Sequence, residues 1–549
     1  MKKIITVLFL IISIAASAQR STINGDNQAV VNSPGLVVGI VIDQMRYDYL
    51  YRFWNKYSND GFRRLVNDGF VFSNTNYNYV PTYTAPGHAC IYTGTTPAYN
   101  GIISNEWYDR NQKKIVYCVG DSTVMPVGTT SISGKMSPSK MLTTTVTDEL
   151  RLATNMNSKV IGIAIKDRSA ILPAGHSANG AYWHDPYSNN WVTSTYYMKD
   201  LPQWVTNFNN RKMVDSLLST KWTTLLPIDQ YTESTSDDNL YEGVFTGELK
   251  PVFPHDLPAL KEKNSELIRE TPFGNTYTKE FVVAAIKAEN LGKGKAMDFL
   301  AVSFSSTDYV GHKFGTNAIE LEDTYLRLDR DIAALLKFLD EWTGNNYLLF
   351  LTADHGAAVN PEFANDRQLN AGKFESGPLS DSLKKYIKKE YGSDSLILSA
   401  STHNIILDRK YIEANKINLE EVQKKCVAFV TRFNGVSTAM TASELSRGIC
   451  RTGIYSFMQN GFNMQRSADV MIQLQPGWMD WFSKTGTTHG AGYSYDTHVP
   501  LIFFGKKIKP GFSIVPTTVC DIAPTISTLL NIEFPSGNSG IPLEQIIKQ

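Results

Sequence analysis

Five short apolar runs, each ending abruptly in polar, charged or glycine residues, dominate the hydrophobic pattern of the chain. They cover residues 36–42, 160–165, 299–304, 347–353 and 499–504. Near-continuous apolar runs of this length are typical of strands that are buried on both faces of a parallel sheet. Ligands bind at the carboxyl ends of strands in open sheets of this kind. We therefore expect the polar residues that end these runs to converge on one site.

Residues 321–339, between the third and fourth runs, carry an amphipathic helical pattern. The apolar positions are Leu321, Tyr325, Leu328, Ile332, Leu335 and Leu339. A strand, a covering helix and a second strand in this order imply a right-handed crossover and parallel pairing. The pattern therefore predicts an α/β fold whose central, mostly parallel sheet is flanked by helices. A further helix, with Pro524 near its start, is expected close to the end of the chain.

Two long stretches depart from this pattern. Residues near 177–275 are rich in Trp, Tyr, Asn, Ser and Pro, and residues near 360–475 mix a charged stretch with short helical patterns. We interpret both as cap insertions in one catalytic domain that spans residues 19–549.

The first eighteen residues have the charged, apolar and small-residue regions of a secretory signal peptide, with cleavage expected after Ala18. A membrane anchor is the alternative, but the apolar run at 4–14 is short for a span and the cleavage region has no lipid-accepting cysteine. The sequence thus predicts a periplasmic or secreted protein with no stable membrane anchor.

The 53 basic and 53 acidic residues balance, so the chain has no overall field that would attract nucleic acid or an anionic membrane. We expect a monomer that acts on a small molecule, whose charge must be met by local side chains. The five cysteines show no close pairs typical of a zinc-cysteine site and leave one or two disulfides and buried free thiols equally open.

The candidate metal ligands follow the apolar runs or lie in glycine-bearing loops. They are Asp43, Asp308, His312, Asp354, His355 and His489, together with Thr84. Each alone fits a helix cap or an ordinary histidine, but their recurrence favours a metal site. Carboxylate and imidazole donors together suit zinc. A threonine hydroxyl needs a base or a metal to become a nucleophile, and Thr84 would have one here.

Six motifs occur in an order that resembles the alkaline phosphatase superfamily. They are Ile42-Asp43-Gln44-Met45-Arg46, Pro81-Thr82-Tyr83-Thr84-Ala85-Pro86-Gly87-His88, Asn105-Glu106-Trp107-Tyr108-Asp109, Asp308-Tyr309-Val310-Gly311-His312, Thr352-Ala353-Asp354-His355-Gly356 and His489-Gly490-Ala491-Gly492. The resemblance is strongest to the branch of nucleotide pyrophosphatase/phosphodiesterase-like enzymes that includes PafA-type bacterial alkaline phosphatases.

The resemblance implies two Zn²⁺ ions and a phosphothreonine intermediate on Thr84. One ion would be held by Asp43, Thr84, Asp354 and His355, and the other by Asp308, His312 and His489. One departure is Asn100, which stands where many relatives have a histidine before the asparagine motif.

Lys166 and Arg168 indicate whether the substrate is a phosphate monoester or a phosphate diester. Residues two apart on a strand face the same side, so both cations are expected to project into the site, where they suit the extra charge of a monoester. A solvated strand end is the alternative. PafA-like phosphatases have such a pair and diesterase relatives lack it, while Asn105 resembles an asparagine that binds a phosphoryl oxygen in both.

We therefore expect a secreted, zinc-dependent alkaline phosphatase of broad specificity for phosphate monoesters. A phosphodiesterase or nucleotide pyrophosphatase of the same superfamily is the alternative enzyme. An inactive envelope binding protein that keeps the fold is a third hypothesis.

Overall fold

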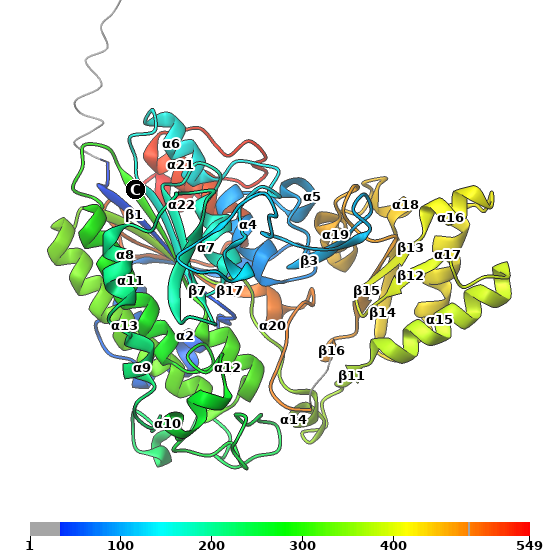
Figure 1. Cartoon of the computed structure of the whole chain (residues 1–549), viewed down its shortest axis with the longest axis horizontal. Coiled ribbons are helices and arrows are strands. Elements are labelled where there is room, and N and C mark those ends of the chain that lie inside the picture. Colours follow the sequence, from blue (N-terminus) through cyan, green and yellow to red (C-terminus); the bar gives the residue numbers. More distant parts are fainter. Residues whose placement is uncertain (1–32, 481–483) are drawn as a thin grey trace, which may run out of the picture. The chain divides into compact units, whose positions relative to one another are not determined.

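A sheet of eleven strands is the centre of the computed structural model, which describes residues 33–480 and 484–549 (Figure 1). Ten of the strands follow the order β18-β2-β17-β10-β1-β9-β6-β7-β8-β5, and β19 also pairs with β2. The five apolar runs form β1 (Leu36–Ile42), β6 (Val160–Ala164), β9 (Asp298–Phe304), β10 (Tyr347–Thr352) and β17 (His498–Gly505). The predicted α/β fold is thus confirmed. The expected signal peptide lies outside the described residues.

The middle of the sheet is parallel, and antiparallel pairs flank it on both sides. Strand β1 pairs in parallel with both β9 and β10, so that Val38 faces Leu300 on one side and Leu349 on the other. Strand β6 continues the parallel pairing beyond β9. Strand β17 runs antiparallel to both β10 and β2 (Phe70–Asn76). The carboxyl ends of β1, β6, β9 and β10 consequently lie at one edge of the sheet.

The stretch expected to be an insertion near 177–275 begins with strands of the central sheet. Strand β7 (Gly180–Asp185) pairs in parallel with β6, and β8 (Asn190–Ser194) pairs with β7. Because these strands are rich in aromatic and polar residues, their sequence was interpreted as part of a cap. The indole of Trp191 is nevertheless buried and stacks on Phe281, with the ring centroids 4.3 Å apart. Only short helices follow, namely α8 (Gln203–Asn209), α9 (Met213–Leu217) and α10 (Leu257–Leu260).

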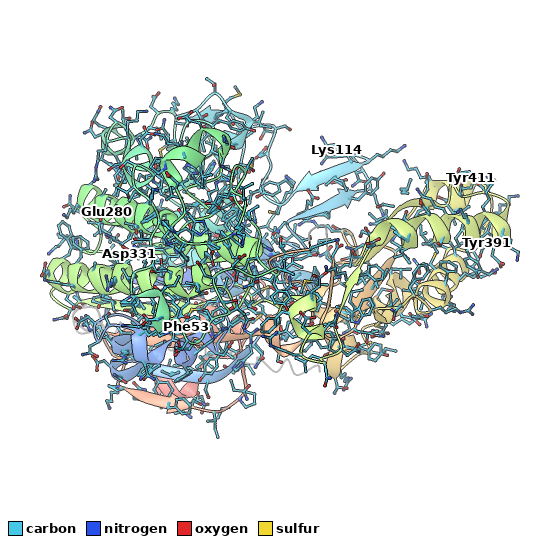
Figure 2. The ribbon with its side chains drawn as sticks, turned by 90° about the horizontal axis from the view of Figure 1, so that it is seen from below. Phe53, Lys114, Glu280, Asp331, Tyr391 and Tyr411 are labelled. Carbon is cyan, nitrogen blue, oxygen red and sulfur yellow. The ribbon has the colours of Figure 1, made fainter. Side chains whose placement is uncertain are left out.

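Two groups of helices cover the sheet (Figure 1). One group contains α11 (Phe273–Glu289), α12 (Ser306–Phe314) and α13 (Ile319–Thr343), and the other contains α4 (Thr84–Thr93), α6 (Val146–Ala153), α7 (Asp167–Ala174) and α21 (Ile522–Leu530). Figure 2 shows Glu280 of α11 close to Asp331 of α13. Helix α13 contains the predicted amphipathic helix, and α21 is the predicted closing helix.

Residues 376–474 form a second, smaller sheet with its own hydrophobic core. The strand order is β12 (Ile397–Ala400), β13 (Asn404–Leu407), β15 (Val470–Leu474) and β14 (Val436–Thr441), all antiparallel. Helices α15 (Ser376–Tyr391), α16 (Arg409–Ala414), α17 (Leu419–Val430), α18 (Ala442–Leu445) and α19 (Gly453–Gly461) accompany it. This sheet lies within the range expected to be the second insertion.

The remaining elements are short. They include α2 (Tyr49–Arg52), α3 (Phe62–Asp68), α5 (Pro97–Asn100), β3 (Glu106–Asp109), β4 (Lys114–Tyr117), β5 (Pro126–Val127), β11 (Gly372–Phe374), β16 (Trp478–Asp480), α20 (Ser494–Thr497), β18 (Gly511–Ser513), β19 (Thr517–Thr518) and α22 (Glu544–Ile547). All five cysteines are free thiols.

Candidate active site

Helix α4 brings Thr84 to the carboxyl edge of the sheet. Thr84 is the first residue of the helix and is 1% exposed. A side chain at Gly87 would place its Cβ 2.3 Å from the carbonyl oxygen of Asp354, so glycine is needed for α4 to approach the end of β10 this closely. The helix N-terminus also favours a negatively charged group beside Thr84.

Three buried aspartates surround this position. Asp43 follows β1, Asp308 lies in the first turn of α12 after β9, and Asp354 follows β10. Oδ1 of Asp43 and Oδ2 of Asp354 have no hydrogen-bond partner among the described residues. Burial, with the neighbouring charge of Asp308, raises the pKa of Asp43 to about 6. Burial and Asp43 together raise the pKa of Asp354 well above its usual range. Buried carboxylates of this kind call for a cation.

The three candidate histidines are oriented as metal ligands. Each makes a hydrogen bond through Nδ1 to a backbone carbonyl: His312 to Thr487 at 2.8 Å, His355 to Gly356 at 2.9 Å and His489 to Thr82 at 2.7 Å. These bonds assign the proton to Nδ1, which leaves the lone pair of Nε2 free to face a metal. Nε2 of His312 lies 3.1 Å from Oδ1 of Asp308, and Nε2 of His355 lies 3.4 Å from Oγ1 of Thr84.

Two groups of donor atoms are compact enough to hold a metal ion. One contains Asp43, Asp354 and His355, and the other contains Asp308, His355 and His489, with the donor atoms of each group within 4.8 Å of one another. His355 belongs to both groups, and its ring stacks on that of His489 with the centroids 3.5 Å apart. The donor set fits two neighbouring cations, and its mixture of carboxylate oxygen and imidazole nitrogen suits zinc.

Lys166 reaches the site, but by a different route from the one expected. Strand β6 ends at Ala164, and Lys166 caps α7, so the strand alternation used to place Lys166 and Arg168 together was wrong. The turn from strand to helix directs Lys166 inward instead. Its Nζ lies 2.5 Å from Oδ2 of Asp308, 2.7 Å from Oδ2 of Asp43 and 3.5 Å from Oγ1 of Thr84.

Arg168 lies in the first turn of α7 and is held by Tyr117. The hydroxyl of Tyr117 donates to Asp167 at 2.6 Å and accepts from an Arg168 guanidinium nitrogen at 3.0 Å. Nε of Arg168 is buried and has no hydrogen-bond partner among the described residues. Burial raises the pKa of Asp43 and the charge of Arg168 opposes this rise, whereas burial lowers the pKa of His88 and Arg168 adds to that fall. The guanidinium is therefore near the donor groups and retains a free N–H.

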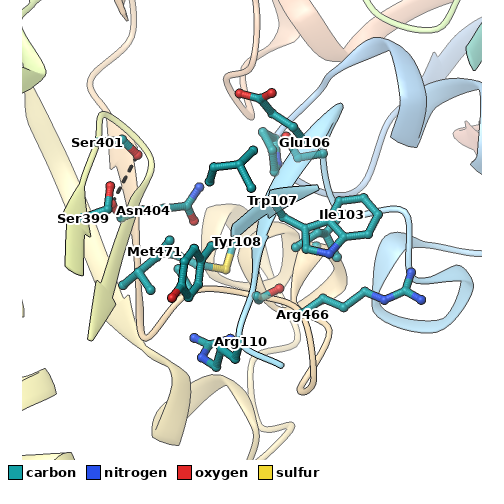
Figure 3. Close-up of a pocket in the computed structure, with 17 residues that line it drawn as sticks. Ile103, Glu106, Trp107, Tyr108, Arg110, Ser399, Ser401, Asn404, Arg466 and Met471 are labelled. Atoms are coloured by element: carbon teal, nitrogen blue, oxygen red, sulfur yellow. Dashed lines mark hydrogen bonds between the residues drawn. The ribbon is translucent and has the colours of Figure 1, made fainter. Parts of the chain in front are cut away.

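Asn105 connects the site to the hairpin of β3 and β4. Its side-chain oxygen accepts a hydrogen bond of 2.9 Å from the backbone N–H of Ala85, next to Thr84. A pocket of about 290 Å³ lies beside it, between this hairpin and the second sheet (Figure 3). Ser104 and Glu106, which flank Asn105, line the pocket together with Tyr108.

Gln44 and His88 support the site, although neither residue was expected to have a role there. The amide nitrogen of Gln44 donates to Oδ1 of Asp308 at 2.7 Å, and its backbone N–H donates to Oδ1 of Asp354 at 3.1 Å. His88 bonds the carbonyl of Thr84 at 2.9 Å and lies 3.4 Å from Asp354. Burial lowers the pKa of His88 to about 3, so the ring is neutral. Both residues lie within the motifs that resemble the family, and this position in the motifs was the only indication of a role in the sequence.

A buried hydroxyl beside candidate metal ligands, at the carboxyl edge of a mainly parallel sheet, fits the alkaline phosphatase superfamily. The profile of the type I phosphodiesterase / nucleotide pyrophosphatase family matches residues 37–495, and the chain belongs to this family.

Curated relatives match nearly the whole chain. It is 45% identical to alkaline phosphatase PafA of Elizabethkingia meningoseptica, covering 94% of this chain and 95% of the relative. It is also 45% identical to alkaline phosphatase PhoV of Synechococcus elongatus, with 94% of each covered. A protein of Myroides odoratus named calcium-transporting ATPase is 48% identical, with coverage of 94% and 96%. The chain is accordingly an enzyme of the alkaline phosphatase type.

The crystal structure of wild-type PafA shares the fold, with a TM-score of 0.91, 45% identity and coverage of 94% of this chain and 99% of that one. A PafA variant with a threonine, an asparagine, a lysine and an arginine replaced matches with the same TM-score and 44% identity. Among the described helices, none is both long and apolar enough to cross a bilayer.

Proposed function

We propose that this enzyme hydrolyses phosphate monoesters of varied structure through a phosphothreonine intermediate on Thr84. The observation that carries the proposal is the position of Lys166, whose ammonium group lies beside Thr84 and two of the candidate metal ligands. With Arg168 on the same turn, the site offers two cations to the phosphoryl oxygens, which fits the dianion of a monoester.

Two zinc ions are the proposed cofactors. Asp43, Thr84, Asp354 and His355 would hold one, and Asp308, His312 and His489 the other. When bound, zinc would favour the alkoxide form of the nucleophile and neutralise the leaving oxygen. The buried, unpartnered oxygens of Asp43 and Asp354 and the Nδ1-protonated histidines support this assignment.

The side chains around Thr84 have separate tasks in the proposed reaction. Oγ1 of Thr84 attacks phosphorus, the bond to the alcohol breaks, and the phosphoryl group becomes attached to Thr84. Lys166, Arg168 and the amide of Asn105 hold the phosphoryl oxygens in both this step and the hydrolysis of phosphothreonine by water. The α4 N-terminus adds to the stabilisation of negative charge.

A comparison of two aryl esters tests the proposal. The enzyme should turn over p-nitrophenyl phosphate with a higher kcat/KM than methyl p-nitrophenyl phosphate, because only the former presents the charge that Lys166 and Arg168 match. A preference for the methyl diester would overturn the proposal.

A phosphodiesterase or nucleotide pyrophosphatase is the second candidate, because the matching family carries that description. Its signature would be little loss of activity on replacing Lys166 and Arg168. An inactive binding protein is disfavoured by the complete set of donor side chains, and purified protein without bound zinc would favour it.

We further propose that the protein is exported, after cleavage following Ala18, and acts as a monomer. The mass of the mature chain tests the cleavage, and light scattering tests the oligomeric state. A mature chain that retains its first eighteen residues would contradict export by this route.

A further inference from the structure

The aromatic ring of Tyr309 lies against the ammonium group of Lys166. Nζ of Lys166 is 5.0 Å from the centroid of the Tyr309 ring. Tyr309 follows Asp308 in α12 and is partly buried against the main hydrophobic core. A cation at this distance from an aromatic ring is attracted by the negative charge density of the ring face. The ring is therefore a further partner of Lys166.

The other contacts of this ammonium group have tasks of their own. Nζ lies 2.7 Å from Oδ2 of Asp43, 2.5 Å from Oδ2 of Asp308 and 3.5 Å from Oγ1 of Thr84. Both carboxylates are proposed zinc ligands and Thr84 is the proposed nucleophile, so a metal ion or a phosphoryl group competes with Lys166 for each of them. The ring of Tyr309 has neither task. It can therefore hold Lys166 in every step of the proposed reaction.

A second cation, the guanidinium of Arg269, lies beside the same ring. Its central carbon is 5.8 Å from the ring centroid of Tyr309. Nε of Arg269 donates to Nδ1 of His184 at 3.2 Å, and a terminal nitrogen donates to the carbonyl of His184 at 3.2 Å. Burial lowers the pKa of His184 to about 3, so its ring is neutral and its Nδ1 can accept this bond. Arg269 is thus fixed at the end of β7.

His184 is also bonded to the turn that carries Lys166. Its backbone N–H donates to the carbonyl of Ile165 at 3.3 Å, and Ile165 directly precedes Lys166. One strand end therefore holds both the backbone beside Lys166 and the side chain of Arg269. Arg269 in turn contacts the ring of Tyr309, which contacts the lysine ammonium. These contacts form a closed circuit that determines where the ammonium group lies.

We propose that Tyr309 is a positioning residue for monoester hydrolysis, which holds the ammonium group of Lys166 at the phosphoryl oxygens through the face of its aromatic ring. The inference rests on the proposed function, in which Lys166 binds those oxygens. A residue that only fills space could be replaced by an aliphatic side chain, whereas attraction of a cation requires the ring. Any effect of Tyr309 on catalysis should also depend on Lys166.

Two replacements of Tyr309 separate the ring from its volume. Tyr309→Phe removes only the hydroxyl, and Tyr309→Leu keeps an apolar side chain but removes the ring. For p-nitrophenyl phosphate, kcat/KM should fall about 5- to 20-fold in the leucine variant and less than about threefold in the phenylalanine variant. The methyl diester should lose less in the leucine variant. Equal losses in the two variants, or equal losses on the two esters, would overturn the proposal.

A double-mutant cycle tests whether Tyr309 acts through Lys166. Lys166→Met removes the ammonium group and keeps a long unbranched side chain. In this background Tyr309→Leu should cause no further loss, because no cation remains to be held. Losses that multiply would show that Tyr309 acts independently and would overturn the proposal.

Tyr391→Leu is the matched control. Tyr391 ends α15, and its ring lies 4.9 Å from Nζ of Lys425, so the change removes a similar contact beside the second sheet (Figure 2). It should leave kcat/KM unchanged. A loss as large as that in Tyr309→Leu would show that removal of any such ring lowers activity, and would overturn the assignment.

Thermal unfolding of the zinc-loaded enzyme measures the same contact without substrate. Tyr309→Leu should lower the Tm by about 1–2 °C more in the wild-type background than in Lys166→Met. Equal shifts in the two backgrounds would overturn the proposal. A preference of the wild type for the diester, with this difference in Tm intact, would overturn the proposed function and leave the contact between Tyr309 and Lys166 established.

Discussion

Nζ of Lys166 lies 3.5 Å from Oγ1 of Thr84 and also contacts the carboxylates of Asp43 and Asp308. Burial opposes its charge, but Asp308 and Asp43 outweigh burial and raise the pKa of Lys166 above its ordinary value. The ammonium group therefore stays charged at neutral pH. One cation thus connects the proposed nucleophile, both proposed metal positions and the place where a phosphoryl oxygen would lie.

Replacing Thr84 by alanine should abolish turnover and leave zinc bound. The change deletes the proposed nucleophile, whereas six other donor side chains remain. We expect kcat for an aryl phosphate to fall at least roughly a thousandfold. Thr84→Ser, which keeps a hydroxyl at the same position, is the matched control and should retain most activity. Metal content is measured on both variants, and an active alanine variant would refute the covalent mechanism.

Removing either cation should penalise monoesters more than diesters. For Lys166→Ala or Arg168→Ala, kcat/KM for p-nitrophenyl phosphate should fall about 10- to 100-fold, the usual size of a lost charged hydrogen bond. The methyl diester should lose only a few-fold. Lys114→Ala, which removes the same charge from the exposed strand β4, is the control. Equal losses on both esters would indicate that the cations only maintain the local fold.

Tyr117→Phe should weaken monoester hydrolysis through Arg168. The change removes the hydroxyl that joins Asp167 to the guanidinium and leaves the charge in place. We expect a several-fold lower kcat/KM, smaller than the loss in Arg168→Ala. Because Tyr117 acts through Arg168, the double variant should be no worse than Arg168→Ala alone. Additive losses in this double-mutant cycle would show that Tyr117 acts independently.

Chelation should inactivate the enzyme reversibly. Dialysis against EDTA is expected to remove activity, and Zn²⁺ should restore it in proportion to the metal bound. Asp308→Asn should bind less zinc than the wild type, because Asp308 contributes to one of the two donor groups. Full activity in protein shown to be free of metal would rule out zinc as the cofactor.

Asp496 gives a pH-dependent prediction. Oδ2 accepts hydrogen bonds from the N–H groups of Gly490 and Ala491, which follow His489. Burial nevertheless raises the pKa of Asp496 from 3.8 to about 7. The raised pKa means that its contribution to stability is complete below pH 3.8 and is lost as the pH rises through 7.

Asp496→Asn does not titrate, so it isolates this effect. Between pH 5 and pH 8 the wild type should lose about 2–3 kcal/mol of unfolding free energy relative to the variant. Denaturant unfolding of both proteins at the two pH values measures the difference, in which other titrating groups cancel. A pH-independent difference would show that Asp496 has the same charge throughout this range.

The parallel centre of the sheet was predictable because its strands are buried on both faces and appear as uninterrupted apolar runs. Strands β7 and β8 were missed because their buried tryptophan and tyrosine residues are interspersed with polar residues. They therefore do not form an uninterrupted apolar run in the sequence. The motifs supplied the proposed ligands in order. Lys166 was predicted as a site residue because of its charge. The direction of its side chain depends on where β6 ends, and the end of β6 is determined by its pairing with β9, not by the local sequence.

Contacts between distant residues account for most of what the sequence did not show. Tyr117, at the end of β4, accepts a hydrogen bond from Arg168 of α7, and Lys166 contacts Asp43 from another part of the chain. Neither contact has a local pattern, since each partner alone resembles an ordinary surface residue. The sequence can supply the residue types of a site, while the tertiary fold determines which of them are neighbours.

The order of the donor groups along the chain has a consequence for biosynthesis. Asp43 is among the first residues of the domain, whereas His489 comes after the second sheet, and β2 near the start pairs with β17 near the end. A growing chain that stops before residue 489 has an incomplete donor set, and such non-local pairings form slowly. The protein should therefore reach its full metal affinity only late, when synthesis of the chain is complete. Metal binding would then distinguish finished molecules from fragments.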